Sequence, residues 1–478
     1  MSAEIVFMGV LDFGLMSILL VIAHLLRSRI KVLQNTFMPS SIIAGFLGLI
    51  GGWQFLDWLP FSTAANNEDS LPAMVQYPGF LIVIIFATLF MGRRKQQRMS
   101  IATLTKSVGD TFFYNLGSLI GMYGLALLFG FFVLARLFPD LHAGFALMLP
   151  AGFVGGHGTA TVIGDFFANT KTGQWNEALT IGYTFATVGL LAAVFGGMLI
   201  INIAARRGWT RVVRSTRDMP MSFKRGFVPE AEQVSMGLET VNPLALDPLT
   251  WHIALVLIAF AVAYYVNNLA ADILHGNYMI PVFCLSLLAG ALIQKLLDLV
   301  KLGQYVDRRI MTRIGSSVSD YLIAFGVASI RITVVIEYAF PLLVMILLGI
   351  IYCVGLFWFV GRRIFRNFWF ERSIFVYGWN TGVVGLAILL LRVVDPKIKT
   401  PTLGDFGLAY LFVAIVEIGT ISVLPILVAG GNILVPGIVL TVGFLVSIYL
   451  SRYLVGWFPQ PADALREGEK TVIAVSGE

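Results

Sequence analysis

The chain has 478 residues, of which 58% are hydrophobic and only 13% are charged. A soluble domain carries about 25% charged residues, so this composition excludes an ordinary water-soluble fold. The formal net charge of +6 does not indicate nucleic-acid binding, because the basic residues form short clusters between apolar runs, as topology signals do. We therefore predict an all-α polytopic membrane protein.

Apolar runs of the length that a spanning helix needs, about 20 residues, follow one another along the chain. The first run precedes Arg27, Arg29 and Lys31 without a small-residue cleavage site, so we expect a retained helix and not a signal peptide. Spans are predicted at 10–26, 40–59, 74–92, 110–135, 177–205, 250–268, 278–296, 316–336, 339–361, 404–429 and 433–454.

Two further apolar segments, 143–168 and 372–393, are rich in glycine and polar residues. We predict that each is re-entrant, entering and leaving the membrane on the same side. With the N-terminus outside, this scheme places all but three of the 33 Lys and Arg residues inside, a strong positive-inside bias. If either segment were counted as one full span, every later loop would be assigned to the opposite side of the membrane. The C-terminus is then cytoplasmic.

The two halves of the chain resemble each other. Each has five predicted spans and one re-entrant segment, and the glycine-rich stretches 152–156 and 378–382 align without gaps. An odd number of spans gives the second copy the opposite orientation, and inverted repeats of this kind are typical of secondary transporters. The predicted divisions are a first repeat at 1–205, a cytoplasmic linker at 206–249, a second repeat at 250–430, and an extra helix with a cytoplasmic tail at 431–478.

The first re-entrant segment has four glycines within seven residues, ending at Gly158. A turn with unpaired N–H groups, followed by a helix that starts near Thr159, attracts an anion. A glycine-faced contact between two helices is the alternative. The predicted substrate-binding residues here are Gly155, Gly156, His157, Gly158 and Thr159. The role of His157 is open between a strut that fixes the turn, a proton relay and a substrate donor.

The second re-entrant segment offers Asn380, Thr381 and Gly382 at its tip, where the side-chain oxygens could complete a substrate pocket. Small-residue packing, with Asn380 bonded across helices, is an equally good explanation. Glu417 lies in the middle of a predicted span, where a carboxyl group is costly and by default suggests function. It could bind a coupling cation or carry a proton, whereas Asp110 and Asp405 lie at span ends and are expected to be solvated.

Thr161 and Thr187 add hydroxyl oxygens that could bind a cation, so with Glu417 they are the predicted ion-coupling residues. The sequence has no GxxxxGK[ST] motif for ATP, no HExxH motif and no Cys/His cluster with metal-ligand spacing. We therefore expect no cofactor, no transition-metal site and no enzymatic activity.

Several of these motifs together resemble one known family, the bacterial glutamate:sodium symporters. The resemblance runs from the first predicted span to the tenth and is carried by residues 25–45, 155–159, 186–189 and 280–284. It implies sodium-coupled uptake of glutamate, ten spans with two re-entrant loops, a homodimer and elevator-like movement.

The chain departs from the family pattern at the Trp379-Asn380-Thr381 tip, where a glycine–histidine or glycine–cysteine pair is usual. The tenth predicted span carries Glu417, whereas the family pattern has an aspartate about four residues further along this helix. The eleventh helix and the long linker are also additions to the family pattern. The chain thus resembles a divergent member.

These observations predict a secondary transporter that carries glutamate or a related small carboxylate with Na+ as the coupling ion. A proton-coupled transporter of another small organic anion, using Glu417, is the first alternative. An ion channel or an intramembrane enzyme is the alternative from another class, but no nucleophile–base pair is apparent near the midplane. The expected location is the lipid bilayer of a bacterial inner membrane.

Overall fold

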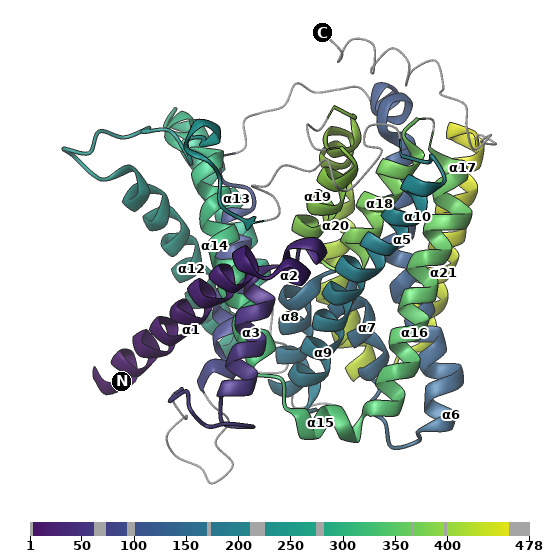
Figure 1. Ribbon diagram of the computed structural model, residues 1–478, viewed down its shortest axis with the longest axis horizontal. Helices are drawn as coiled ribbons and strands as arrows, with labels where there is room; N and C mark the ends of the chain where they lie inside the picture. The colour runs from purple at the N-terminus through teal and green to yellow at the C-terminus, as the bar shows by residue number, and fades with distance from the viewer. Residues whose placement is uncertain are drawn as a thin grey trace. The chain divides into compact units, whose positions relative to one another are not determined.

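The computed structural model describes residues 3–61, 73–92, 101–169, 174–210, 225–273, 282–365, 367–395 and 399–457. Regular structure in this part of the chain is entirely helical (Figure 1). Eight of the described helices are long and apolar enough to cross a membrane, and they fall on eight of the predicted spans. They cover Phe7–Arg29, Val108–Leu137, Ala178–Arg206, Pro248–Ala270, Val282–Leu299, Ala339–Ile364, Phe412–Ala429 and Leu434–Val455.

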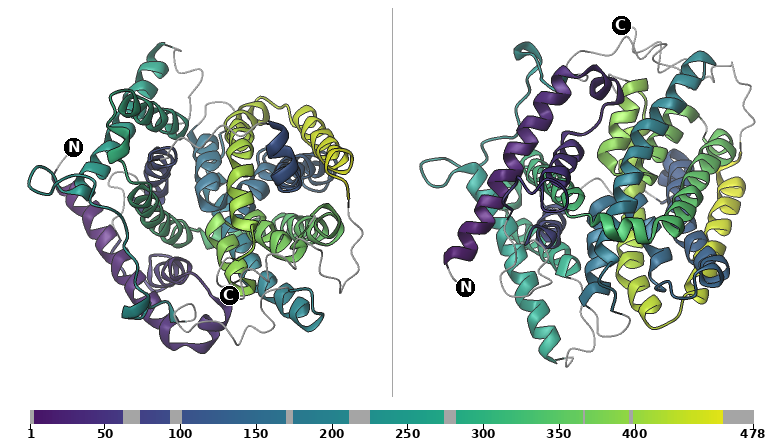
Figure 2. Two further views of the ribbon diagram at one scale, coloured as in Figure 1. Left: turned by 90° about the horizontal axis from the view of Figure 1, so that it is seen from above. Right: turned by 60° about the horizontal axis from the view of Figure 1, so that its bottom comes forward.

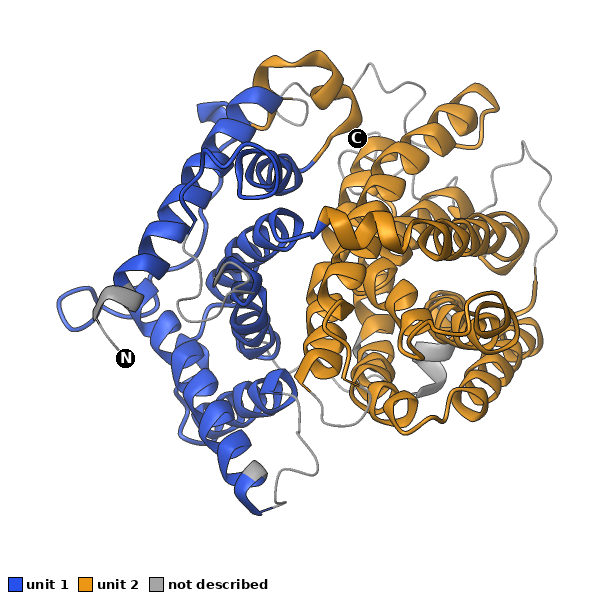
Figure 3. Ribbon diagram, turned by 90° about the horizontal axis from the view of Figure 1, so that it is seen from below, with its two compact units in different colours: residues 1–27, 39–97, 227–331 blue, residues 28–38, 98–226, 332–478 orange. Residues whose placement is uncertain are grey.

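The helices divide between two compact units, which Figure 3 shows in different colours. Unit 1 comprises residues 1–27, 39–97 and 227–331, and unit 2 comprises residues 28–38, 98–226 and 332–478. Each unit therefore takes segments from both halves of the sequence.

Unit 1 is built from six main helices. They are α1 (Ala3–Arg29), α3 (Ser40–Gly51), α4 (Tyr77–Thr88), α12 (Pro248–Ile273), α13 (Val282–Leu299) and α14 (Arg308–Ala328). Arg308 fixes the C-terminal end of α4 because its guanidinium donates hydrogen bonds to the carbonyl oxygens of Thr88, Leu89 and Met91 at 2.9–3.0 Å. Cations near the last turn of a helix stabilise its unpaired carbonyl groups.

Two predicted spans in unit 1 differ in their boundaries. The helix predicted at 40–59 ends at Gly51, where the amides of Asp57 and Trp58 bond to Gly52 and Gly51 carbonyls in a loop. The helix predicted at 316–336 begins earlier, after the N-cap Asp307, and ends at Ala328. Its first turns are strongly basic, so hydropathy alone does not reveal them. Residues 280 and 281, part of the stretch 280–284 that contributes to the family resemblance, lie outside the described residues.

Unit 2 contains the remaining helices. They are α2 (Lys31–Thr36), α5 (Ile101–Phe129), α6 (Ala135–Leu137), α7 (Phe145–Phe153), α8 (Gly156–Asn169), α9 (Ala178–Leu191), α10 (Gly197–Arg206), α15 (Ile332–Glu337), α16 (Ala339–Gly355), α17 (Arg362–Ile364), α18 (Trp369–Asn380), α19 (Val384–Val394), α20 (Thr402–Ala429) and α21 (Leu434–Leu450). Helix α21, the predicted extra span, packs along α5 (Figure 2). Glycines permit this approach: a Cβ atom on Gly124 would lie 2.6 Å from the Thr441 nitrogen.

A π-helical turn at Ala192–Gly196 joins α9 to α10. Such a turn contains one extra residue and releases a carbonyl group from the usual helical pairing. The hydroxyl of Tyr377, on α18, donates a hydrogen bond of 3.0 Å to the Ala192 carbonyl oxygen. A helix of the second predicted repeat is thereby tied to a helix of the first.

Candidate functional site

The two glycine-rich segments each contain a helix break. Helix α7 ends at Phe153 and α8 begins at Gly156, while α18 ends at Asn380 and α19 begins at Val384. The first helical start is three residues earlier than predicted, so Thr159 lies within the first turn of α8. Both breaks fall within the predicted segments 143–168 and 372–393.

The two breaks lie against each other within unit 2. Gly156 has φ +61, and a Cβ atom there would lie 2.7 Å from Val383 Cγ1 and 3.4 Å from the Gly382 carbonyl oxygen. On α9, a Cβ atom at Gly189 would lie 2.6 Å from the Thr381 carbonyl oxygen. Glycine is therefore needed at position 156 for both its backbone conformation and its close contact.

Helix α8 presents its N-terminus at this junction. The first N–H groups of an α-helix have no partner within the helix, and they carry a partial positive charge. Gly155 and Gly158 are partly exposed, while His157 and Thr159 are buried. This backbone can bind a carboxylate without a basic side chain.

His157 belongs to a hydrogen-bonded group between α8 and α9. Its Nε2 lies 3.1 Å from Thr187 Oγ1, and its ring stacks on Tyr183 at 5.9 Å. The Thr161 hydroxyl lies 2.6 Å from the His157 carbonyl oxygen and 3.2 Å from the Tyr183 hydroxyl. Among the described residues, His157 Nδ1 is buried without a hydrogen-bond partner. One ring nitrogen thus fixes the imidazole and the other can serve a ligand.

At the second break, the three predicted residues have different surroundings. Thr381 donates its hydroxyl to the Tyr377 carbonyl oxygen at 2.7 Å, which closes the last turn of α18. Asn380 Oδ1 lies 3.3 Å from the Ser118 hydroxyl on α5. Gly382 faces Gly156 through its carbonyl group. Ser118 was missed by sequence reasoning because a lone serine inside an apolar span carries no signal.

Glu417 lies in a separate group, on α20. Its carboxylate accepts a hydrogen bond of 2.7 Å from the Tyr410 hydroxyl, and the side chain is buried. The Tyr410 ring is 5.8 Å from the Trp379 ring, next to the second break. The structure thus brings Thr161 and Thr187 together around His157 but places Glu417 with other partners.

A buried ionic cluster joins α5, α18 and α20. Arg372 donates to Asp405 at 2.6 Å and to Thr111 at 2.7 Å, and it lies 3.9 Å from Asp110. Asn367 accepts two further bonds from the same guanidinium. The expectation that Asp110 and Asp405 are solvated is wrong, because Asp110 is buried and both carboxylates pair with Arg372.

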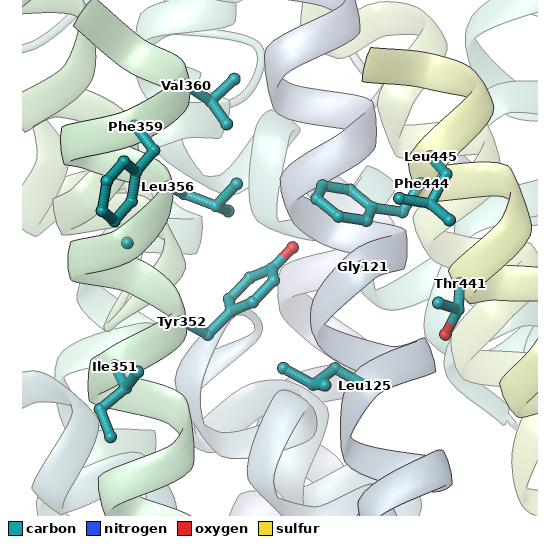
Figure 4. Close-up of a pocket in the computed structure, with 11 residues that line it drawn as sticks. Gly121, Leu125, Ile351, Tyr352, Leu356, Phe359, Val360, Thr441, Phe444 and Leu445 are labelled. Carbon is teal, nitrogen blue, oxygen red and sulfur yellow. The ribbon is translucent and has the colours of Figure 1, made fainter. Parts of the chain in front are cut away.

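An apolar groove of about 320 Å³ lies elsewhere in unit 2, between α5, α16 and α21 (Figure 4). Its walls include Tyr352, Phe359 and Phe444, and none of the predicted site residues lines it. The Tyr352 hydroxyl donates to the Ser118 carbonyl oxygen at 2.9 Å. The groove has little polar surface and does not suit a charged substrate.

A family model described as sodium/glutamate symporter matches residues 140–371. The chain is thus similar to the sodium/glutamate symporter family over just under half of its length. This symporter family consists of transporters and not enzymes, which supports sodium-coupled transport by an integral membrane protein.

The match to the symporter family covers the first helix break but ends before the second. His157 and Thr187 lie inside the matched residues, whereas Asn380 and Glu417 lie beyond them. No curated protein matches the chain. The family match therefore says nothing about the residues at the second break, and only the geometry bears on their roles.

Proposed function

We propose that this protein is a secondary active transporter that couples sodium entry to the uptake of glutamate or a related small carboxylate. The observation that carries the proposal is the meeting of the two helix breaks at Gly156 and Val383. Broken helices that face each other inside a membrane protein supply helix ends for both anions and cations. The family match supports the sodium coupling.

The substrate carboxylate would bind the N-terminal amides of α8 at residues 155–159. His157 Nδ1 is a candidate for a second contact, because its other nitrogen is already engaged by Thr187. Asn380, Thr381 and Gly382 would close the pocket from the second break. The oxygens of Thr161, Thr187 and Glu417 are the proposed cation ligands.

We also propose the inverted repeats, the re-entrant segments and the elevator-like movement. The support is the composition of the units: α1, α3 and α4 join α12, α13 and α14 in unit 1. The corresponding later helices of both halves, with both breaks, form unit 2. A rigid unit that contains the whole binding site is what an elevator-like movement requires. The dimer stays a prediction from the resemblance.

The decisive experiment measures labelled glutamate uptake by proteoliposomes under an inward sodium gradient. We expect accumulation above equilibrium, with none when sodium is equal on both sides. Gly156→Ala should lower uptake at least about tenfold, because it adds backbone strain and a clash with Val383. Equal uptake with and without the gradient would remove the coupling claim.

Gly208→Ala is the matched control for this substitution. Gly208 also has a positive φ, +68, but a Cβ atom there would meet nothing within 4 Å. This variant carries the backbone strain without the clash, and it should transport normally. An equal loss in both variants would show that the junction of the breaks is not the cause.

Proton coupling through Glu417 is a second candidate, favoured by the buried carboxyl group and its bond to Tyr410. Glu417→Gln should then abolish accumulation driven by a pH gradient while substrate exchange continues. Unchanged accumulation in this variant would reject the proton-carrier role.

A further inference from the structure

Asn115, on α5 in unit 2, is a buried polar residue that none of the roles above uses. Its side chain is 0% exposed. Among the residues that the structure describes, neither its amide oxygen nor its amide nitrogen has a hydrogen-bond partner. Buried polar groups are almost always paired, so an amide with two unpaired atoms points to a ligand.

Asn115 shares a helix face with Ser118, one turn further along α5. The Ser118 hydroxyl is 2.9 Å from the main-chain carbonyl oxygen of Asn115 and 3.3 Å from the side-chain oxygen Oδ1 of Asn380. A hydroxyl has one proton, so it cannot fully satisfy both acceptors. Asn380 Oδ1 therefore keeps capacity to bind another partner.

Asn380 is the last residue of α18. The C-terminal end of a helix carries a partial negative charge and unpaired carbonyl groups, which favour a cation. In broken-helix transporters, such C-terminal ends and side-chain oxygens coordinate Na+. Hard cations take oxygen ligands, and neutral amide and hydroxyl oxygens are suitable.

We infer that the amide oxygens of Asn115 and Asn380 and the hydroxyl of Ser118 form a sodium-binding site at the C-terminal end of α18. The inference rests on the proposed sodium coupling and adds a site distinct from Thr161, Thr187 and Glu417. An ion here orders the tip of α18, which also lies in the proposed substrate pocket. Sodium binding and substrate binding are thereby coupled through one segment.

The test measures thermal unfolding of the full-length protein in detergent, without substrate, in NaCl and in choline chloride at equal ionic strength. A ligand that binds only the folded state raises the unfolding temperature. We expect NaCl to stabilise the wild type and to stabilise Asn115→Ala clearly less, because that variant keeps only the cation ligands Thr161, Thr187 and Glu417. Asn115→Asp should respond strongly to NaCl, because a carboxylate attracts the cation more than an amide does.

The aspartate variant separates a sodium site from a structural role. If Asn115 were only structural, a buried carboxylate would destabilise the protein at every NaCl concentration. Ser447→Ala is the control, since this buried serine on α21 donates to the Phe113 carbonyl oxygen of the same helix α5 at 3.0 Å. Its sodium response should match the wild type.

Two results would overturn the inference in distinguishable ways. A sodium response in Asn115→Ala as large as that of the wild type would reject this site and leave sodium coupling intact. A wild type without any sodium response, and without sodium-driven uptake in proteoliposomes, would reject the proposed function together with the site.

Discussion

Two clusters of side chains hold the helices of unit 2 together by different means. The ionic cluster lies near the starts of α18 and α20, beside Asp110 of α5. The aromatic cluster lies near the starts of α7, α9 and α16. In the ionic cluster, Arg372 binds Asp405 and Thr111 and lies close to Asp110. In the aromatic cluster, His142 stacks on Trp175 at 4.9 Å, and Phe145 stacks on Tyr338 at 6.0 Å.

These clusters occupy equivalent places in the proposed repeats, because α5, α18 and α20 correspond to α16, α7 and α9. They lie at opposite ends of unit 2. In Figure 1, α17, which directly precedes α18 in the chain, lies near the top, and α15, which directly precedes α16, lies near the bottom. Burial, assisted by the carboxylate of Glu177, raises the pKa of Tyr338, so its hydroxyl stays neutral. The comparison shows that two unrelated chemistries can anchor a helix that leads into a break.

The largest expected effect is at the ionic cluster. Arg372→Met should destabilise unit 2 by about 3–5 kcal/mol, because it leaves Asp110 and Asp405 without their buried counter-charge. Equilibrium unfolding in a mixed-detergent titration measures this. A loss below about 1 kcal/mol, the value of an exposed pair, would contradict the description of the cluster as a buried network.

A conservative change at the same residue should still be costly. Arg372→Lys keeps the charge but cannot reproduce the planar fork that reaches Thr111, Asp405 and Asn367 at once. We expect a loss of about 2 kcal/mol in the same titration. Stability equal to the wild type would show that charge alone, and not the geometry of the guanidinium, holds the three helices.

The smallest effect is expected at the aromatic cluster. Trp175→Phe keeps a ring beside His142 and Phe145 and should cost less than about 1.5 kcal/mol. The two clusters differ most clearly in this pair of conservative changes, because Trp175→Phe should lose less stability than Arg372→Lys. A larger loss in Trp175→Phe than in Arg372→Lys would reverse it.

Much of this architecture could be predicted from periodicity and composition. Glycine clusters indicated both helix breaks, and hydropathy indicated the eight long apolar helices. The basic first turns of α14 were missed, because a charged helix start does not register as a span. Local signals thus located the elements but not all of their ends.

Tertiary partners could not be predicted in the same way. Asp110, Arg372 and Asp405 are distant in sequence, and each resembles an ordinary solvated residue at a span end. Asn115 carries little signal in the sequence, since an asparagine in an apolar helix gains meaning only when its neighbours are known to leave it unpaired. The adjacency of Gly156 and Val383 likewise required the packed structure.

The π-helical turn at Ala192–Gly196 has a consequence for how the chain tolerates changes in length. Removing one residue there would restore a regular α-helix with little change in the orientation of α10 relative to α9, because the π turn takes up the extra residue within one wider turn. The same deletion would withdraw the carbonyl that receives the Tyr377 hydroxyl. A single-codon deletion at this place would therefore remove the hydrogen bond that joins α18 to the chain between α9 and α10.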